Sequence, residues 1–137
     1  MKVVVRVRVE TPVHPTESSA KVRAACLNMF PDLAFVEEGG TLVGEGASMD
    51  AFRDLVRNQK IRDAAREVLI RGRRGNAASF HLSKQAAFVR RVNFSAHSPL
   101  GDIAVIVEDQ DLDALIDRVA ESTTGRRLTT SDRSAGT

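Results

Sequence analysis

The chain has 137 residues, of which 42% are hydrophobic and 28% charged, and its formal net charge is +2. This composition is ordinary for a globular domain, and no apolar run approaches the roughly 20 residues that a membrane helix needs. The single cysteine, Cys26, excludes an internal disulfide and fits a reducing cytoplasmic compartment.

Apolar spacing divides the first half of the chain into strands and helices. The amino terminus, MKVVVRVRVE, alternates valine with charged residues, which is typical of a strand with one buried face and not of a signal peptide. Later apolar residues recur three and four positions apart, as on the buried side of a helix. We expect a strand at 2–10, a helix capped by Thr16 and stopped by Pro31, strands at 33–36 and 41–44 joined by a Gly-Gly turn, and a helix capped by Ser48 that breaks at 58–60 before a second helix ending at Gly72.

The second half begins with a stretch of mixed periods, FHLSKQAAFVRRVNF, at residues 80–94. Its first residues alternate like a strand, the KQAA unit resembles a helix start, and Val92 to Phe94 return to alternation. The β-branched run at 103–107 predicts a strand covered on both faces. A final amphipathic helix over 112–119, started near Asp109 or Asp111, precedes a polar tail. We expect one domain at 1–121 and a disordered tail at 122–137.

The order of these elements indicates the fold class. Successive strands are not each separated by one helix, so a fully parallel sheet is not expected. The pattern favours an α+β fold, with a mostly antiparallel sheet and helices packed on one face. The other face is then either solvated or covered by a second copy in a homodimer.

The side chains that catalysis or metal binding would need do not form a known pattern. The three histidines have no metal-ligand spacing, and no second cysteine is available to help them. Asp109, Asp111 and Asp113 resemble the start of a calcium loop, but Ala114 stands at the glycine position of that loop. We therefore expect no enzymatic activity, no bound metal and no cofactor.

Positive charge gathers in the middle of the chain. Residues 53–91 contain eleven cations and three anions, a net charge of +8, and the remainder carries −6. The chain has no Trp and no Tyr, so recognition of RNA phosphates is favoured over base stacking. The alternative is that Lys84 and Arg90 only keep a sheet edge soluble, or that Lys84 and Gln85 bond backbone carbonyl groups. The predicted RNA-binding residues are Arg71, Arg73, Arg74, Lys84, Gln85, Arg90 and Arg91.

Several motifs together resemble a known family. The segments VHPTES, LNMFPD, RNQKIRDAAREVLIRGRRGN, FHLSKQAAFVRRVNF, SPLGDI and LIDRVA, spread over residues 2–121, are similar to those of an archaeal UPF-type family labelled RNA-binding or exosome-associated. The resemblance implies a fold similar to that of the large-subunit ribosomal protein that binds 5S RNA, a homodimer and no enzymatic activity. The chain departs from the family pattern at Ser83 (usually Asn), Arg90 (usually Gly) and Arg118 (usually aromatic).

Two functional hypotheses follow. The first is a non-catalytic protein that binds structured RNA through the basic residues and is associated with exosome- or ribosome-related proteins. The alternative is a homodimeric protein-interaction module that does not bind RNA directly.

Overall fold

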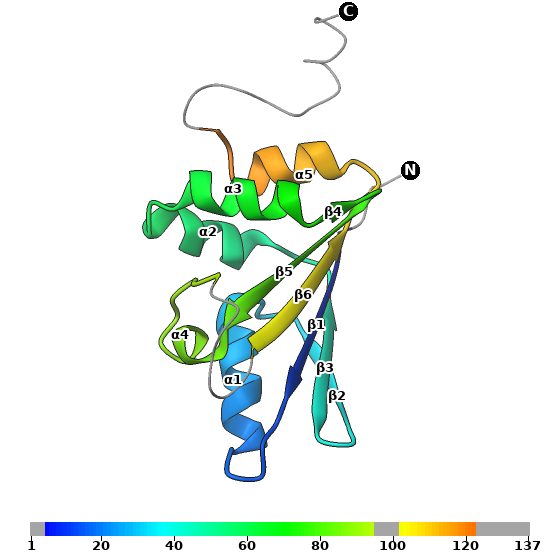
Figure 1. Cartoon of the computed structure of the whole chain (residues 1–137), viewed down its shortest axis with the longest axis vertical. Coiled ribbons are helices and arrows are strands. Elements are labelled where there is room, and N and C mark those ends of the chain that lie inside the picture. Colours follow the sequence, from blue (N-terminus) through cyan, green and yellow to red (C-terminus); the bar gives the residue numbers. More distant parts are fainter. Residues whose placement is uncertain (1–4, 95–101, 123–137) are drawn as a thin grey trace, which may run out of the picture.

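The computed structural model describes residues 5–94 and 102–122, which form one sheet and a set of helices on one side of it (Figure 1). In Figure 1 the helices lie to the left of the strands and above them. The elements in chain order are β1 (Arg6–Pro12), α1 (Ser19–Met29), β2 (Ala34–Glu38), β3 (Thr41–Gly46), α2 (Asp50–Asn58), α3 (Arg62–Arg71), β4 (Arg73–Arg74), β5 (Ala77–Ser83), α4 (Lys84–Phe88), β6 (Asp102–Glu108) and α5 (Leu112–Val119).

The six strands form a sheet in the order β2-β3-β1-β6-β5-β4, in which every neighbouring pair is antiparallel. The central strand β1 pairs with β3 on one side and with β6 on the other; Val9, for example, lies opposite Gly44 and Val105. The α+β class with an antiparallel sheet is therefore confirmed.

Alternating side chains give the sheet one buried and one open face. On β1, Val7 and Val9 are buried under the helices, while Arg6 and Arg8 are exposed on the other side. Phe52 on α2 stacks on Phe30, with ring centroids 5.5 Å apart, and also contacts ring atoms of the sheet residue Phe80 at 5.7 Å between centroids. Aromatic packing of this kind joins the helices to the buried face.

A bend joins α2 and α3 at the point where the periodic spacing of the apolar residues of α2 stops and that of α3 begins. Gln59 follows the last turn of α2, and Lys60 has a left-handed φ of 59°. The backbone amide of Ile61 then donates to Val56, 3.1 Å away, which closes the bend. The predicted break at 58–60 is confirmed, and Gly72 follows α3 as expected.

Other boundaries differ from the prediction. Ser18, and not Thr16, caps α1, because its hydroxyl accepts the amide of Lys21. β6 is not covered on both faces, since none of the described helices packs over the open face (Figure 1) and Ile106 is 40% exposed. The segment 92–94 is not a strand: the side chain of Gln59 binds both backbone groups of Val92, and the Asn93 carbonyl accepts the amide of Ser83 at the end of β5.

Two further predictions concern the loops and the tail. After α3 the chain forms a tight hairpin, in which β4 pairs with β5 and Gly75 has a φ of 61°. The Gly39-Gly40 turn between β2 and β3 is confirmed, with positive φ at both glycines. The tail prediction falls mainly on residues 123–137, outside the described residues.

Candidate nucleic-acid interface

Strand β5 separates the sequence-predicted basic residues into two groups. Arg71, Arg73 and Arg74 lie where α3 turns into the β4–β5 hairpin, before the strand begins. Gln85, Arg90 and Arg91 follow the other end of the strand. Seven residues of antiparallel strand span about 20 Å, so the two groups do not form one continuous surface.

At the hairpin end, carboxylates accompany two of the three arginines. Arg71 forms an exposed ion pair with Glu67, one turn earlier on α3. Arg73 binds the largely buried carboxylate of Asp113 at the start of α5. Arg74 is exposed and donates to the carbonyl of Arg73, 3.1 Å away. Within this group Arg73 joins β4 to α5, whereas the Arg71 ion pair lies within α3 and Arg74 bonds its chain neighbour.

Lys84 is not on the surface, contrary to its assignment to the exposed basic group. Its side chain is fully buried, and its ammonium group donates to the carbonyl of Pro12 at 2.7 Å and to Glu17 at 3.1 Å. A buried ammonium ion needs such partners, because leaving water is costly for a charge. Lys84 thus contributes to the core and is out of reach of RNA phosphates, whereas Gln85 beside it is exposed.

The electrostatics around Lys84 agree with this structural role. Burial of the Glu17 carboxyl opposes ionisation, but the amide of His14 and the Lys84 ammonium donate to it, so its pKa lies below the ordinary value. Burial raises the pKa of the Cys26 thiol to about 12, although the nearby Lys84 charge acts in the opposite direction. Cys26 is therefore a core residue and not a reactive thiol.

The three departures from the family pattern have local explanations. The hydroxyl of Ser83 caps α4 by accepting the amide of Ala86 at 3.2 Å, a role that Asn fills equally well. Arg90 has a φ of 57°, a conformation that favours glycine. Arg118, in the last turn of α5, lies 3.9 Å from the buried carboxylate of Asp109.

Folding neutralises much of the central positive charge. Seven of the eleven cations of residues 53–91 have a carboxylate within 4 Å in the described structure. Most of these carboxylates come from the acidic flanks of the chain, which the fold brings back onto the middle. The carboxylates from outside the segment are Glu17, Asp50, Asp113, Asp117 and Glu121.

Four cations of that segment have no carboxylate partner among the described residues. Three of them lie around the contact between Gln59 and Val92. Gln59 clamps the backbone of Val92: its amide nitrogen donates to the Val92 carbonyl at 3.1 Å and its oxygen accepts the Val92 amide at 2.6 Å. Lys60 and Arg91 are the chain neighbours of this clamp. The four cations are Lys60, Arg74, Arg90 and Arg91, of which only Arg74 lies at the hairpin.

We call the exposed and half-buried cations around this clamp the bend surface. It combines the α2–α3 bend with the turn that follows α4, and it contains Arg57, Lys60, Arg62, Arg90 and Arg91. In Figure 1 both segments lie on the left side of the molecule. Among the described residues, Glu121 provides the one carboxylate that contacts these cations. The bend surface therefore keeps a substantial positive charge.

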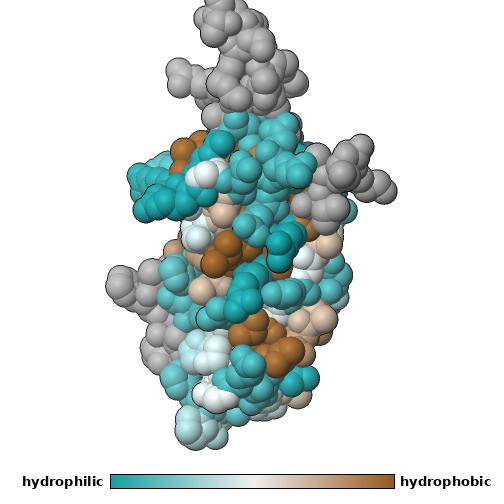
Figure 2. All heavy atoms as spheres, turned by 90° about the vertical axis from the view of Figure 1, so that its right-hand side faces the viewer, coloured by the Kyte–Doolittle hydropathy of each residue, from teal (hydrophilic) through white to brown (hydrophobic). Residues whose placement is uncertain are grey.

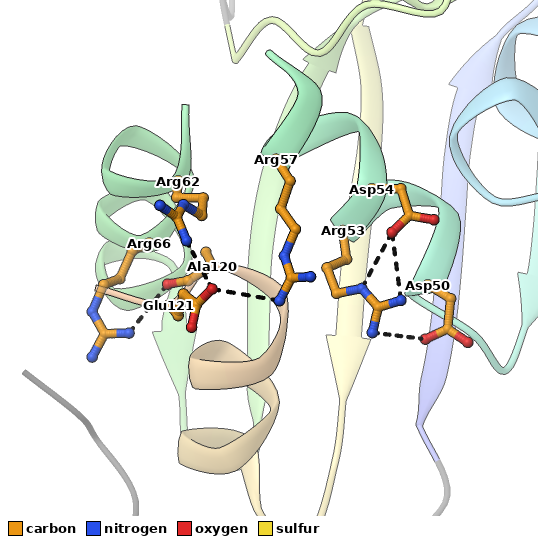
Figure 3. A network of polar contacts seen from close by, with 8 residues as sticks. All are labelled: Asp50, Arg53, Asp54, Arg57, Arg62, Arg66, Ala120 and Glu121. Atoms are coloured by element: carbon orange, nitrogen blue, oxygen red, sulfur yellow. Dashed lines mark hydrogen bonds and ion pairs between the residues drawn. The ribbon is translucent and has the colours of Figure 1, made fainter. Parts of the chain in front are cut away.

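An open hollow of about 490 Å³ forms part of the bend surface and is lined by Arg57, Lys60, Arg62 and Glu121. Figure 3 shows Arg57 of α2 and Arg62 of α3 pointing toward Glu121 from two sides. One oxygen of Glu121 accepts from Arg62 at 2.7 Å and from Arg57 at 3.5 Å. Two guanidinium groups converging on one oxygen form a geometry suited to an anion.

Two apolar side chains lie exposed beside these cations. Phe88 ends α4 and is 36% exposed, and Val89 is 67% exposed. We expected little base stacking because the chain has no Trp and no Tyr, and the exposed ring of Phe88 was missed. The ring of Phe88 lies next to arginines and is large enough for one nucleobase to stack on it.

The bend surface was only partly visible in the sequence. The phase break at 58–60 indicated a bend, and a bend between two amphipathic helices exposes its polar residues. The contact between Gln59 and Val92 spans 33 residues and has no local sequence signal. Sequence reasoning therefore included Arg57, Lys60 and Arg62 in the +8 charge of residues 53–91 and did not assign them to a binding site.

The open sheet face has a different character. Its arginines are paired within the sheet: Arg8 contacts Glu10 and Glu45 at 3.1 Å, and Arg6 lies 3.9 Å from Glu108. Apolar side chains lie between these charges, and Val36 of β2 is 58% exposed. Figure 2, which faces the right-hand side of Figure 1, shows apolar patches interrupted by polar side chains. This face lacks the excess of cations that phosphate binding needs.

Within residues 5–94 and 102–122, no group of three or more His, Cys, Asp or Glu side chains could hold a metal ion. No helix of the same residues has the length and apolar character for crossing a membrane.

Comparison with known proteins places the chain among archaeal relatives. A family model described as RNA binding matches residues 6–108. The chain is similar to UPF0201 protein MJ1564 of Methanocaldococcus jannaschii, with 39% identity over 91% of this chain and 75% of that protein. A UPF0200/UPF0201 protein of Archaeoglobus fulgidus is 43% identical over 66% of this chain, which spans only 28% of that longer protein. A crystal structure of a UPF0201 protein superposes with a TM-score of 0.81 at 35% identity, covering 89% of this chain and 98% of that one.

The buried contact of Lys84 predicts a large loss of stability on substitution. Lys84→Met removes the cation that neutralises the largely buried Glu17 carboxylate and the ammonium donor of the Pro12 carbonyl, so we expect the free energy of unfolding to fall by about 3–5 kcal/mol in urea denaturation. Adding Glu17→Gln should recover part of this loss by removing the unpaired charge. Arg8→Met is the matched control, because its ion pairs are exposed and should contribute about 1 kcal/mol or less. Equal losses for Lys84→Met and Arg8→Met would contradict the assignment.

Proposed function

Since the chain belongs to the archaeal UPF0201 family, we propose that it is a non-catalytic protein that binds RNA through the bend surface. The match of residues 6–108 to an RNA-binding family model supports RNA as the class of ligand. The choice of surface rests on charge: the described cations without a carboxylate partner gather mainly around the Gln59–Val92 clamp.

The chemistry of the bend surface suits a phosphate backbone. Guanidinium groups bind phosphate oxygens through paired hydrogen bonds, and ammonium groups act as point charges. Arg57 and Arg62 come from α2 and α3, and Arg90 and Arg91 come from the turn after α4, so the cations extend across three elements. Such an array matches successive phosphates better than a single small anion.

Recognition should depend mainly on the shape and charge of the RNA. The exposed ring of Phe88 is the aromatic side chain next to the bend surface, and it provides at most a single stacking contact. Structured RNA is therefore our proposed partner, with little discrimination between sequences. An association with exosome- or ribosome-related proteins in the cytoplasm is a further part of this proposal, and it follows from the family resemblance.

Salt dependence tests the bend surface directly. Lys60→Gln with Arg91→Gln removes two charges whose side chains make no described contact, so the fold should be unaffected. Each lost phosphate contact reduces counterion release, and we expect the log–log slope of RNA affinity against salt to flatten by about 1 to 2. Filter binding or fluorescence anisotropy with one structured RNA at several salt concentrations measures this slope.

The matched control is Arg71→Gln with Arg74→Gln, which removes two charges from the hairpin end of β5. Its slope should equal that of the wild type. A flattened slope in this control alone would place the RNA at the hairpin end, which is one of the two parts of the predicted basic site. The same weak binding by all three proteins would contradict RNA binding through either group.

The open sheet face supports a second candidate function, a homodimeric interaction module. Val36 and Ile106 are 58% and 40% exposed on a face that the helices of residues 5–94 and 102–122 leave uncovered (Figure 1). The charges between them are already paired, so a second copy would meet a nearly neutral surface. This function is compatible with RNA binding, because the bend surface lies on the helical side of the sheet.

The dimer has its own test in sedimentation velocity at micromolar concentration. We expect the wild type to sediment as a dimer and Ile106→Glu to sediment as a monomer, because a carboxylate in the interface would lose its water. Val89→Glu places the same charge on an exposed apolar residue of the helical side and should remain dimeric. A wild-type species of only 14.9 kDa would exclude the sheet-face dimer.

A further inference from the structure

We propose that Arg57, Lys60 and Arg62 form a phosphate-binding site. In the free protein the carboxylate of Glu121 occupies this site, and a bound phosphate displaces it. The inference rests on the proposed function, since it assigns one phosphate contact of the bend surface. It adds a regulatory residue, Glu121, that competes with the ligand.

The geometry of the hollow resembles an anion site that is already occupied. The Oε1 atom of Glu121 lies 2.7 Å from Nη1 of Arg62 and 3.5 Å from Nη2 of Arg57. Lys60 lines the same hollow and has no carboxylate partner in the described parts of the chain. The hollow therefore holds three cations and one carboxylate, and a phosphate with more charge and more oxygens would satisfy these donors better than Glu121 does.

Neighbouring contacts show why Glu121 can leave without disturbing the fold. Arg66 anchors the end of α5 through Asp117 at 2.8 Å and the carbonyl of Ala120 at 3.1 Å, and its side chain is only 10% exposed. Glu121 follows this anchor and is half exposed, as is Arg57 (Figure 3). Ion pairs exposed to this extent contribute little to stability, so water and a stronger anion can replace them.

Glu121 lies two residues after the last residue of α5, Val119. Its side chain is held to the hollow by the ion pairs with Arg57 and Arg62. A swing of this side chain exposes both guanidinium groups. Glu121 thus acts as an internal substitute for a phosphate, and it should weaken binding of any ligand that carries one.

Titration with inorganic phosphate, followed by the NMR signals of the arginine Nε–H groups, tests the site without RNA. In the wild type we expect saturable shifts of the Arg57 and Arg62 signals. Glu121→Gln should bind phosphate about three- to fivefold more tightly, because the competing charge is removed from an exposed ion pair. Adding Arg62→Gln to this variant should abolish the saturable shift.

Glu45→Gln is the matched control, because Glu45 is an exposed carboxylate paired with Arg8 on the open sheet face. It should bind phosphate as the wild type does. Equal affinities of the wild type and Glu121→Gln, or the absence of saturable shifts in both, would overturn the displacement.

A second arm with a short RNA separates this inference from the proposed function. Tighter binding of both phosphate and RNA by Glu121→Gln supports both. Tighter binding of phosphate alone supports the site and contradicts RNA as its ligand. Tighter or unchanged binding of RNA without any effect on phosphate contradicts the displacement and leaves RNA binding to the rest of the bend surface.

Discussion

A fully buried lysine organises the half of the molecule in which the candidate interface lies. Its ammonium group can leave water only because the Pro12 carbonyl and the Glu17 carboxylate replace its hydration. These partners belong to the end of β1 and to the segment before α1, so Lys84 joins both to the start of α4. Asn28 of α1 adds a hydrogen bond to the carbonyl of Ala87, 2.9 Å away. The position of α4 in turn determines where the turn with Arg90 and Arg91 meets the α2–α3 bend.

Features that follow from local spacing were predicted from the sequence, whereas features that depend on long-range contacts, such as that of Lys84, were not. Periodicity identified the helices and the antiparallel, one-sided sheet, because burial of an apolar face dictates those spacings. It also located the bend at 58–60 and the helix start at KQAA. An apolar run alone does not show whether both faces of a strand are covered. The run at 103–107 predicted a fully buried β6, but Ile106 is exposed because none of the described helices packs over it.

Charge was predicted less well than the fold, for a physical reason. A count along the chain treats each residue as if its partners were its sequence neighbours. Lys84 and Glu17 are 67 residues apart, and Arg66 and Asp117 are 51 apart, so their pairing depends on tertiary structure. The +8 segment is therefore mostly neutralised by the acidic flanks, and Lys60, Arg74, Arg90 and Arg91 are its described cations without a carboxylate partner. Arg90 and Arg91 are the members of the predicted site that meet this condition beside the bend, while Lys84 does not.

The two sides of the sheet consequently have different chemistry. The helical side has unpaired cations and an exposed aromatic ring at the bend, and the open side has paired charges with apolar gaps. A protein that binds RNA on one side and a second copy on the other would use both without conflict. In a dimer of this kind two bend surfaces would face outward, which would increase the avidity for a long RNA.

Amide chemical-shift mapping with a short structured RNA distinguishes the surfaces of the protein. If RNA contacts the helical side at the bend, as we propose, the shifts concentrate at residues 57–62 and 88–92, with few on β1, β3 and β6. Shifts concentrated on those strands, or on the β4–β5 hairpin, would contradict this proposal.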